Sequence, residues 1–246
     1  MDKNKLAVSL FDRYAQRYQE KYMDQGRYHE SLRAFCEAVQ PTDASILELA
    51  CGPGNVTRYL LQMRPDFQIL ATDLAPQMLV LAKANNLTVE TQCLDCRNIL
   101  SLEQKFDAIA AAFVLPYLNT QEVIRLFEDV AASLRQGGLL YISTMAGSSS
   151  LSGWQGPSDG GSDKLYMDYH EEAQLLAWLA QKGFVLMYEQ RLPIEEQMAE
   201  PYDLILIADT ADQIGNYRIE DIEPDRIACF FAYGTQETIN KQAECI

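Results

Sequence analysis

The chain has 246 residues, with 35 acidic against 20 basic side chains and a formal net charge of −15. A surface this acidic repels a nucleic-acid backbone, so we expect no nucleic-acid partner. No apolar run reaches the roughly 18 residues of a membrane span, and residues 1–5 lack the apolar segment of a signal peptide, so we expect a cytoplasmic protein without membrane association.

The six cysteines are scattered along the chain and include one Cys-x-x-Cys, formed by Cys93 and Cys96. No second pair and no nearby histidine accompany it, so the spacing of a four-ligand zinc site is absent. We therefore expect reduced thiols and no metal site.

Residues 6–40 have the periodicity of two helices. The aromatic residues Phe11, Tyr14, Tyr18 and Tyr22 recur at helical spacing, and a second apolar stripe follows. Such a stripe is commonly a packing face; its alternative role, covering a ligand, is considered below.

The central pattern of the sequence predicts a short apolar strand at 46–49, a turn at Gly52-Pro53-Gly54 and a helix over 56–63. Glycines at such a turn let the backbone approach a ligand, and the following helix offers unpaired N–H groups to it. We expect Gly52 and Gly54 both to face the ligand, so that a valine at either position abolishes binding but not folding.

Two carboxylates and one threonine narrow the ligand class. Glu48 lies inside the first strand, where a buried acid needs a partner. The next strand, 67–73, ends at Asp73, about 20 residues beyond the turn, where an acid can bind ribose hydroxyls. Thr57 replaces the third glycine of a dinucleotide fingerprint, which favours a nucleoside without a pyrophosphate.

The run Glu48-Leu-Ala-Cys-Gly52-Pro-Gly54, followed by Asp73, resembles the first two motifs of class I S-adenosylmethionine-dependent methyltransferases of the small-molecule type. That family commonly has glycine where this chain has Ala50, so we expect an ordinary backbone angle there. The resemblance implies an α/β, Rossmann-like fold with S-adenosyl-L-methionine as cofactor. Its seven-stranded sheet is mostly parallel with an antiparallel last strand, has helices on both faces, and follows an N-terminal helical cap.

The remaining pattern supplies the other elements of such a sheet. A helix begins at Pro76, and a second helix is stopped by Gly137 and Gly138. We predict helices over 77–84, 121–134 and 170–182, and strands over 87–93, 139–144, 184–190 and 202–208. Residues 105–117 are predicted to form a further strand that runs out into a loop.

The resemblance also assigns a cofactor site. Met78 matches an apolar residue against the adenine, or is an ordinary core methionine. Asp95 matches the acid that accepts from the adenine amino group, or is an exposed turn residue. Tyr18 belongs to the helix that covers the methionine end. The full predicted set is Glu48, Ala50, Gly52, Gly54, Asp73, Met78, Asp95, Ala112, Tyr14 and Tyr22.

A glycine- and serine-rich stretch at 147–163 carries the lone Trp154. It is either a flexible surface loop or a lid over the substrate. The predicted organisation is a helical cap at 1–40, a methyltransferase core at 41–209 with a possible lid at 147–165, and an acidic extension of unknown role at 210–246.

The implied reaction is methyl transfer to N, O, S or C of a small molecule, with a base where the acceptor carries a proton. His170, Tyr117, His29 and Asp168 are the candidate bases, although a surface or helix-capping role is the more common one for each histidine. The sequence contains no acceptor-specific motif.

Two rival functions stay open. A nicotinamide-dependent oxidoreductase is disfavoured by Thr57 and by the antiparallel closing strands. A non-catalytic nucleoside-binding regulatory or assembly module on the same fold fits the long acidic tail. Either a monomer or a homodimer is compatible with the sequence.

Overall fold

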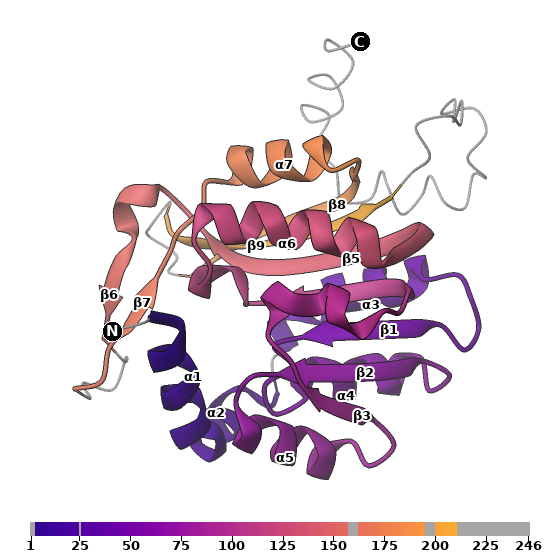
Figure 1. Cartoon of the computed structure of the whole chain (residues 1–246), viewed down its shortest axis with the longest axis horizontal. Helices are drawn as coiled ribbons and strands as arrows, with labels where there is room; N and C mark the ends of the chain where they lie inside the picture. Colours follow the sequence, from indigo (N-terminus) through magenta and orange to yellow (C-terminus); the bar gives the residue numbers. More distant parts are fainter. Residues whose placement is uncertain (1–2, 25, 157–161, 195–199, 211–246) are drawn as a thin grey trace.

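A seven-stranded mixed sheet forms the centre of the computed structural model, which describes residues 3–24, 26–156, 162–194 and 200–210 (Figure 1). The strand order is β3-β2-β1-β4-β5-β9-β8. β9 runs antiparallel to both neighbours, β5 and β8, and the other six strands share one direction, as predicted. The strands are β1 (Ser45–Leu49), β2 (Gln68–Asp73), β3 (Glu90–Cys93), β4 (Phe106–Ala112), β5 (Leu134–Ala146), β8 (Val185–Pro193) and β9 (Tyr202–Asp209).

Helices cover both faces of this sheet, because its central strands are apolar on both sides. In β1, Ile46 packs into the core beneath one helical layer, and Leu47 and Leu49 pack into the core beneath the other. The first layer contains α3 (His29–Ala38), α4 (Asn55–Met63) and α5 (Pro76–Asn85), and the second contains α6 (Thr120–Ser133) and α7 (Glu172–Gln181).

The N-terminal segment forms three α-helices, so the prediction of two helices was wrong. α1 (Lys3–Arg13) and α2 (Ala15–Tyr22) are separated at Tyr14, which has φ −105° and ψ 17°. A short turn, η1 (Gly26–Tyr28), then leads into α3. This break divides the aromatic stripe between two helices. α1 and α2 lie together at one end of the sheet (Figure 1).

The described part of 147–163 is more ordered than a surface loop. After the turn η4 (Ser149–Leu151), β6 (Gly153–Gln155) pairs with β7 (Leu165–Met167) in a two-stranded antiparallel sheet that the sequence did not predict. Trp154 packs edge-on against Tyr166 across this hairpin, with ring centres 5.5 Å apart.

The hairpin and α1 are in contact. Lys3 Nζ lies 3.1 Å from the centre of the Tyr166 ring. The Tyr14 hydroxyl donates to Asp163 at 2.8 Å, and Arg13 Nη1 lies 3.3 Å from the same carboxylate. Both elements therefore stand at the same end of the sheet (Figure 1).

Several element boundaries differ from the predicted ones; the third strand, for example, begins at Glu90 and not at residue 87. α6 ends at Ser133, and β5 already begins at the next residue, so Gly137 and Gly138 lie inside a strand and do not stop the helix. Residues 211–246, which include Cys229 and Cys245, fall outside the described ranges. Within the described ranges no helix has the length and apolarity needed to cross a membrane.

Candidate functional site

A pocket opens where β1, β2, β3 and β4 end, and we call it the strand-end pocket. Such a position is where open α/β sheets bind ligands. α1 covers it with Asn4, Ala7, Val8 and Phe11. The predicted cofactor residues that line it are Ala50, Gly52, Asp73, Met78, Asp95 and Ala112.

Ala50 follows β1 with φ 51°, so the expectation of an ordinary angle was wrong. The chain must turn sharply there, because the next two N–H groups reach the end of β2. Cys51 N–H donates to the Thr72 carbonyl oxygen, and Gly52 N–H donates to Asp73 Oδ2, both at 2.9 Å. A left-handed angle costs an alanine about 1–2 kcal/mol, which explains why glycine suits this position better.

The two glycines of the turn have different tasks. A Cβ on Gly52 would meet only Tyr18 Cε1, at 3.8 Å, so this residue leaves open space beside the pocket. A Cβ on Gly54 would lie 2.5 Å from Asn86 Nδ2 and 3.1 Å from Ala82 Cα. Gly54 therefore serves the packing of α4 against α5 and lines neither pocket. The expectation that a valine at Gly54 leaves folding intact was wrong.

Glu48 is 1 % exposed in the middle of β1 and accepts a short hydrogen bond from the Thr57 hydroxyl. Burial raises the pKa of Glu48 to about 8, and the charge of Asp73 adds to the increase. Thr57, which replaces the third glycine of the dinucleotide fingerprint, is thus the partner that this buried acid requires.

Asp73 ends β2 and has its carboxylate fixed by backbone. Oδ1 accepts from Ala75 N–H at 2.8 Å, and Oδ2 accepts from Gly52 N–H at 2.9 Å. Burial raises the pKa of Asp73, and these two hydrogen bonds oppose the increase. Because each oxygen keeps a free lone pair, the carboxylate can still accept from two neighbouring hydroxyls.

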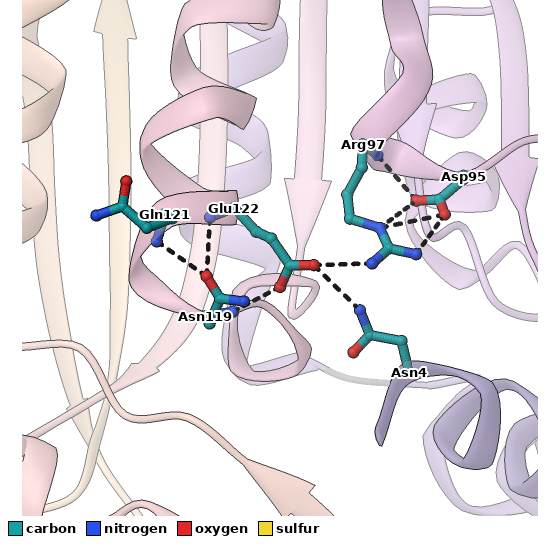
Figure 2. A network of polar contacts seen from close by, with 6 residues as sticks. All are labelled: Asn4, Asp95, Arg97, Asn119, Gln121 and Glu122. Carbon is teal, nitrogen blue, oxygen red and sulfur yellow. Dashed lines mark hydrogen bonds and ion pairs between the residues drawn. The ribbon is translucent and has the colours of Figure 1, made fainter. Parts of the chain in front are cut away.

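Met78 and Asp95 both line the strand-end pocket. Met78 is 2 % exposed and packs with Ala15 and Ala75, so it is a core residue as well as a pocket residue. Asp95 forms a bidentate ion pair with Arg97, which also contacts Glu122 (Figure 2). Sequence reasoning missed Arg97, although its spacing two residues after Asp95 was a usable signal.

A second pocket, which we call the tyrosine pocket, lies between α3, α4 and the sheet. Tyr28, His29, Tyr59 and Tyr141 contribute its aromatic wall, and Glu48 lines it as well. The two pockets share the residues Tyr18, Ala50, Gly52, Ala112 and Phe113, so they adjoin at the glycine turn.

Phe113 was missed by sequence reasoning, although it borders both pockets. It follows β4 with φ 53°, and its N–H donates to the Ser143 carbonyl oxygen at 2.7 Å. Its ring packs against Tyr28 with the centres 5.3 Å apart. Strained residues of this kind concentrate at functional sites.

The candidate bases are dispersed. His170 is 3 % exposed, lies outside both pockets, and has Nε2 3.0 Å from the Leu118 carbonyl oxygen. Tyr117 lines the strand-end pocket, where burial raises its pKa. His29 lines the tyrosine pocket and stacks on Tyr59 at 4.4 Å. Asp168 lines neither pocket, and burial raises its pKa.

The three tyrosines of α2 and its N-cap are also separated. Tyr18 lines both pockets, whereas Tyr14 and Tyr22 line neither. Tyr14 is 40 % exposed, and Tyr22 packs on Tyr18 with ring centres 4.6 Å apart. Trp154, the residue proposed for a lid, lines neither pocket and is 49 % exposed.

A buried carboxylate behind the tyrosine pocket was also missed. Asp203, in β9, is 4 % exposed and accepts from the Tyr28 hydroxyl at 2.6 Å. Arg27 Nη2 lies 3.2 Å from the same oxygen. Burial and the bond to Asp203 raise the pKa of Tyr28. The two partners are 175 residues apart, so no local pattern could have joined them.

No group of three or more metal-ligating side chains occurs in the ranges that the structure describes. Cys93 and Cys96 are both free thiols, and burial raises the pKa of Cys96 to about 12. The two pockets are lined by carboxylates, backbone and aromatic rings.

Comparison with known proteins agrees with this geometry. The family described as "Methyltransferase domain" matches residues 46–138. A malonyl-[acyl-carrier protein] O-methyltransferase of Acetivibrio thermocellus is 29 % identical over 57 % of this chain and 49 % of its own length. A demethylmenaquinone methyltransferase of Thermotoga maritima is 28 % identical over 56 % of this chain and 61 % of its own. The chain thus spans about half the length of the curated relatives it matches.

A solved structure supports the fold. The magnesium protoporphyrin IX methyltransferase of Synechocystis, which has S-adenosylmethionine bound, superposes with a TM-score of 0.65 at 17 % identity. The match covers 86 % of this chain and 98 % of that one.

Proposed function

We propose that this chain transfers the methyl group of S-adenosyl-L-methionine to a small molecule. The basis is that it carries a methyltransferase domain of the class I S-adenosylmethionine-dependent family. One observation carries the proposal: Gly52, Asp73 and Asp95, at three successive strand ends, and Met78, in α5, line a single pocket. That set supplies a close backbone approach, a ribose acceptor, an apolar surface for adenine and an acceptor for its amino group.

Each of these residues has a definite task toward the cofactor. The free lone pairs of Asp73 accept from the two ribose hydroxyls. Met78 packs against one adenine face, and Asp95 accepts from its amino group. The methionine end passes Gly52 toward the tyrosine pocket, since Gly52 and Ala50 border both pockets.

The cofactor supplies an activated methyl group, so the protein mainly aligns the acceptor with it. We place the acceptor at the tyrosine pocket, whose aromatic wall suits an organic molecule. Tyr117 and His29 are the predicted bases that line a pocket. The names of the relatives include malonyl-[acyl-carrier protein] and demethylmenaquinone, so we specify no acceptor beyond a small molecule and no atom among N, O, S and C.

Calorimetry with S-adenosylhomocysteine tests the cofactor assignment. Asp73→Ala removes the ribose acceptor and weakens binding by about 1.5–3 kcal/mol, roughly 10- to 150-fold in Kd. Asp129→Ala, on α6 and outside both pockets, is the matched control and leaves Kd unchanged. Absence of wild-type binding, or a stronger response to NADH, would refute the proposed function.

Catalysis is tested by a turnover screen of a metabolite library with S-adenosylmethionine, read as release of S-adenosylhomocysteine. We expect release that depends on an added acceptor. Tight cofactor binding without acceptor-dependent release from any compound would favour the non-catalytic module instead.

A further inference from the structure

Arg97 joins three segments at the rim of the strand-end pocket (Figure 2). It is the second residue of η2 (Cys96–Leu102), immediately after β3. Its Nη2 lies 2.6 Å from Asp95 Oδ2, and its Nη1 lies 2.8 Å from Glu122 Oε1 in the first turn of α6. The same Glu122 oxygen is 3.4 Å from Asn4 Nδ2 of α1.

Arg97 uses most of the hydrogen-bonding capacity of Asp95. Its backbone N–H and Nε each donate to Oδ1 at 2.9 Å, Nε is shared with Oδ2 at 3.1 Å, and Nη2 donates to Oδ2. Three donors on a carboxylate that accepts about four leave room for one more. Hydrogen bonding by Arg97 lowers the pKa of Asp95, which keeps this acceptor ionised. The guanidinium fork therefore fixes both the plane and the charge of Asp95.

Glu122 is equally fixed. It belongs to the capping box of α6, where its Oε2 accepts from Asn119 N–H at 2.9 Å (Figure 2). Its remaining oxygen is left for Arg97 and Asn4. A half-buried Arg between two such carboxylates has little freedom to turn, since its planar donors match both partners at once.

Asn4 connects this network to α1 in either orientation of its amide. Rotated by 180°, the amide oxygen accepts from Arg97 Nη1 at 2.7 Å, and its nitrogen donates to the Tyr117 carbonyl oxygen at 2.8 Å. The first turn of α1 is thus fastened to the residues that orient Asp95. The same helix covers the pocket with Ala7, Val8 and Phe11.

We propose that Arg97 is a positioning residue that couples recognition of the cofactor's adenine to the docking of α1. It holds Asp95 toward the adenine amino group and, through Glu122 and Asn4, holds α1 over the same pocket. The inference rests on the proposed function. Coupling of this kind is reciprocal: if a docked α1 favours the cofactor, the cofactor favours the docked helix by the same factor.

Base preference is the first test. Calorimetry compares S-adenosylhomocysteine with S-inosylhomocysteine, whose base presents a carbonyl oxygen, an acceptor, at the position where adenine presents its amino donor to Asp95. Wild type prefers the adenosyl compound by about tenfold or more. Arg97→Met weakens adenosyl binding by about tenfold and removes most of that preference. Arg97→Lys restores the positive charge but not the planar, two-pronged set of donors, so it recovers little of the adenosyl affinity or of the base preference.

Arg135→Met is the matched control, since Arg135 pairs with Asp107 and neither residue lines a pocket. It leaves both affinities unchanged. If Arg97→Met does not fold, Glu122→Gln is used in its place, because it keeps the shape of the network and removes one charge. We expect it to reduce adenosyl affinity and the base preference in the same direction.

Docking of α1 is the second test. Hydrogen exchange of residues 3–13 is measured with and without S-adenosylhomocysteine. Wild type gains protection on binding, and Arg97→Met loses that gain. Asn4→Ala removes only the hydrogen bond between the network and α1. It therefore loses the increase in protection on ligand binding and keeps the preference for the adenosyl compound. If Arg97→Met and Glu122→Gln keep both preference and protection, the coupling is refuted; a wild type that does not bind refutes the proposed function instead.

Discussion

Replacing Glu48 with glutamine tests the electrostatics of the site through stability alone. Glu48 is 1 % exposed, and its pKa is raised by burial from the ordinary 4.5 to about 8. Between these values the folded protein keeps a proton that the unfolded chain releases. The contribution of Glu48 to stability is therefore complete below pH 4.5 and is lost as pH rises through 8.

The size of the effect follows from the two pKa values. At 1.36 kcal/mol per pH unit, the ionised side chain costs the folded state about 5 kcal/mol above pH 8. Glutamine has the shape of the protonated acid, can still accept from Thr57, and does not ionise. The difference in free energy of unfolding between Glu48→Gln and wild type therefore grows by about 3 kcal/mol, in favour of Glu48→Gln, as the pH rises from 6 to 9.

Urea unfolding of both proteins at intervals from pH 6 to pH 9, followed by circular dichroism, gives the difference directly. Glu37→Gln, on the exposed side of α3, is the control and tracks wild type throughout. A difference between Glu48→Gln and wild type that stays constant across this range would refute the reasoning, because a group that ionises normally contributes no such slope.

The backbone of the glycine turn yields further predictions. Ala50→Gly relieves the left-handed angle and raises the free energy of unfolding by about 1 kcal/mol. The control Ala112→Gly, in β4, lowers the free energy of unfolding. If Ala50→Gly lowered it as well, the backbone at Ala50 would not be strained. Gly54→Ala drives a methyl group into Asn86 and lowers the free energy of unfolding by at least about 1–3 kcal/mol in thermal melts. Gly52→Ala places an alanine at φ 53° and so also loses about 1–2 kcal/mol of stability, but it folds and weakens S-adenosylhomocysteine binding by about tenfold or more. If the two glycine variants weakened binding equally, the different roles of Gly52 and Gly54 would be disproved.

The sheet and the glycine turn could be predicted because their signals are local. An apolar strand followed by Gly52 and an acid about 20 residues later specifies a nucleoside site within one stretch of chain. The backbone angle of Ala50 could not be read the same way. It depends on the hydrogen bonds that the following N–H groups make to β2, and these exist only after the two strands have paired.

The parts of the site that were missed are long-range. Arg97 meets Asn4 and Glu122, and Tyr28 meets Asp203, through contacts between segments far apart in sequence. Gly52 and Gly54 look alike in sequence, but only one has a neighbouring helix against its Cα. Their roles separate once the packing of α4 on α5 is known.

The contacts of α1 also have a consequence for the order in which the molecule is made. This helix is synthesised before the sheet, yet its polar partners include Glu122, Asp163 and Tyr166, which follow much later in the chain; an earlier partner is the Gln77 N–H, which donates to Asp12. At about 5–20 residues per second, roughly ten to thirty seconds separate its synthesis from that of β7. The strand ends of β1 to β4, and the residues Ala75 and Met78 against which Val8 and Phe11 pack, are complete before then, so α1 gains its contacts to the hairpin only after the pocket exists. A nascent chain can therefore meet its first cofactor molecule while α1 is held by fewer contacts than in the finished protein.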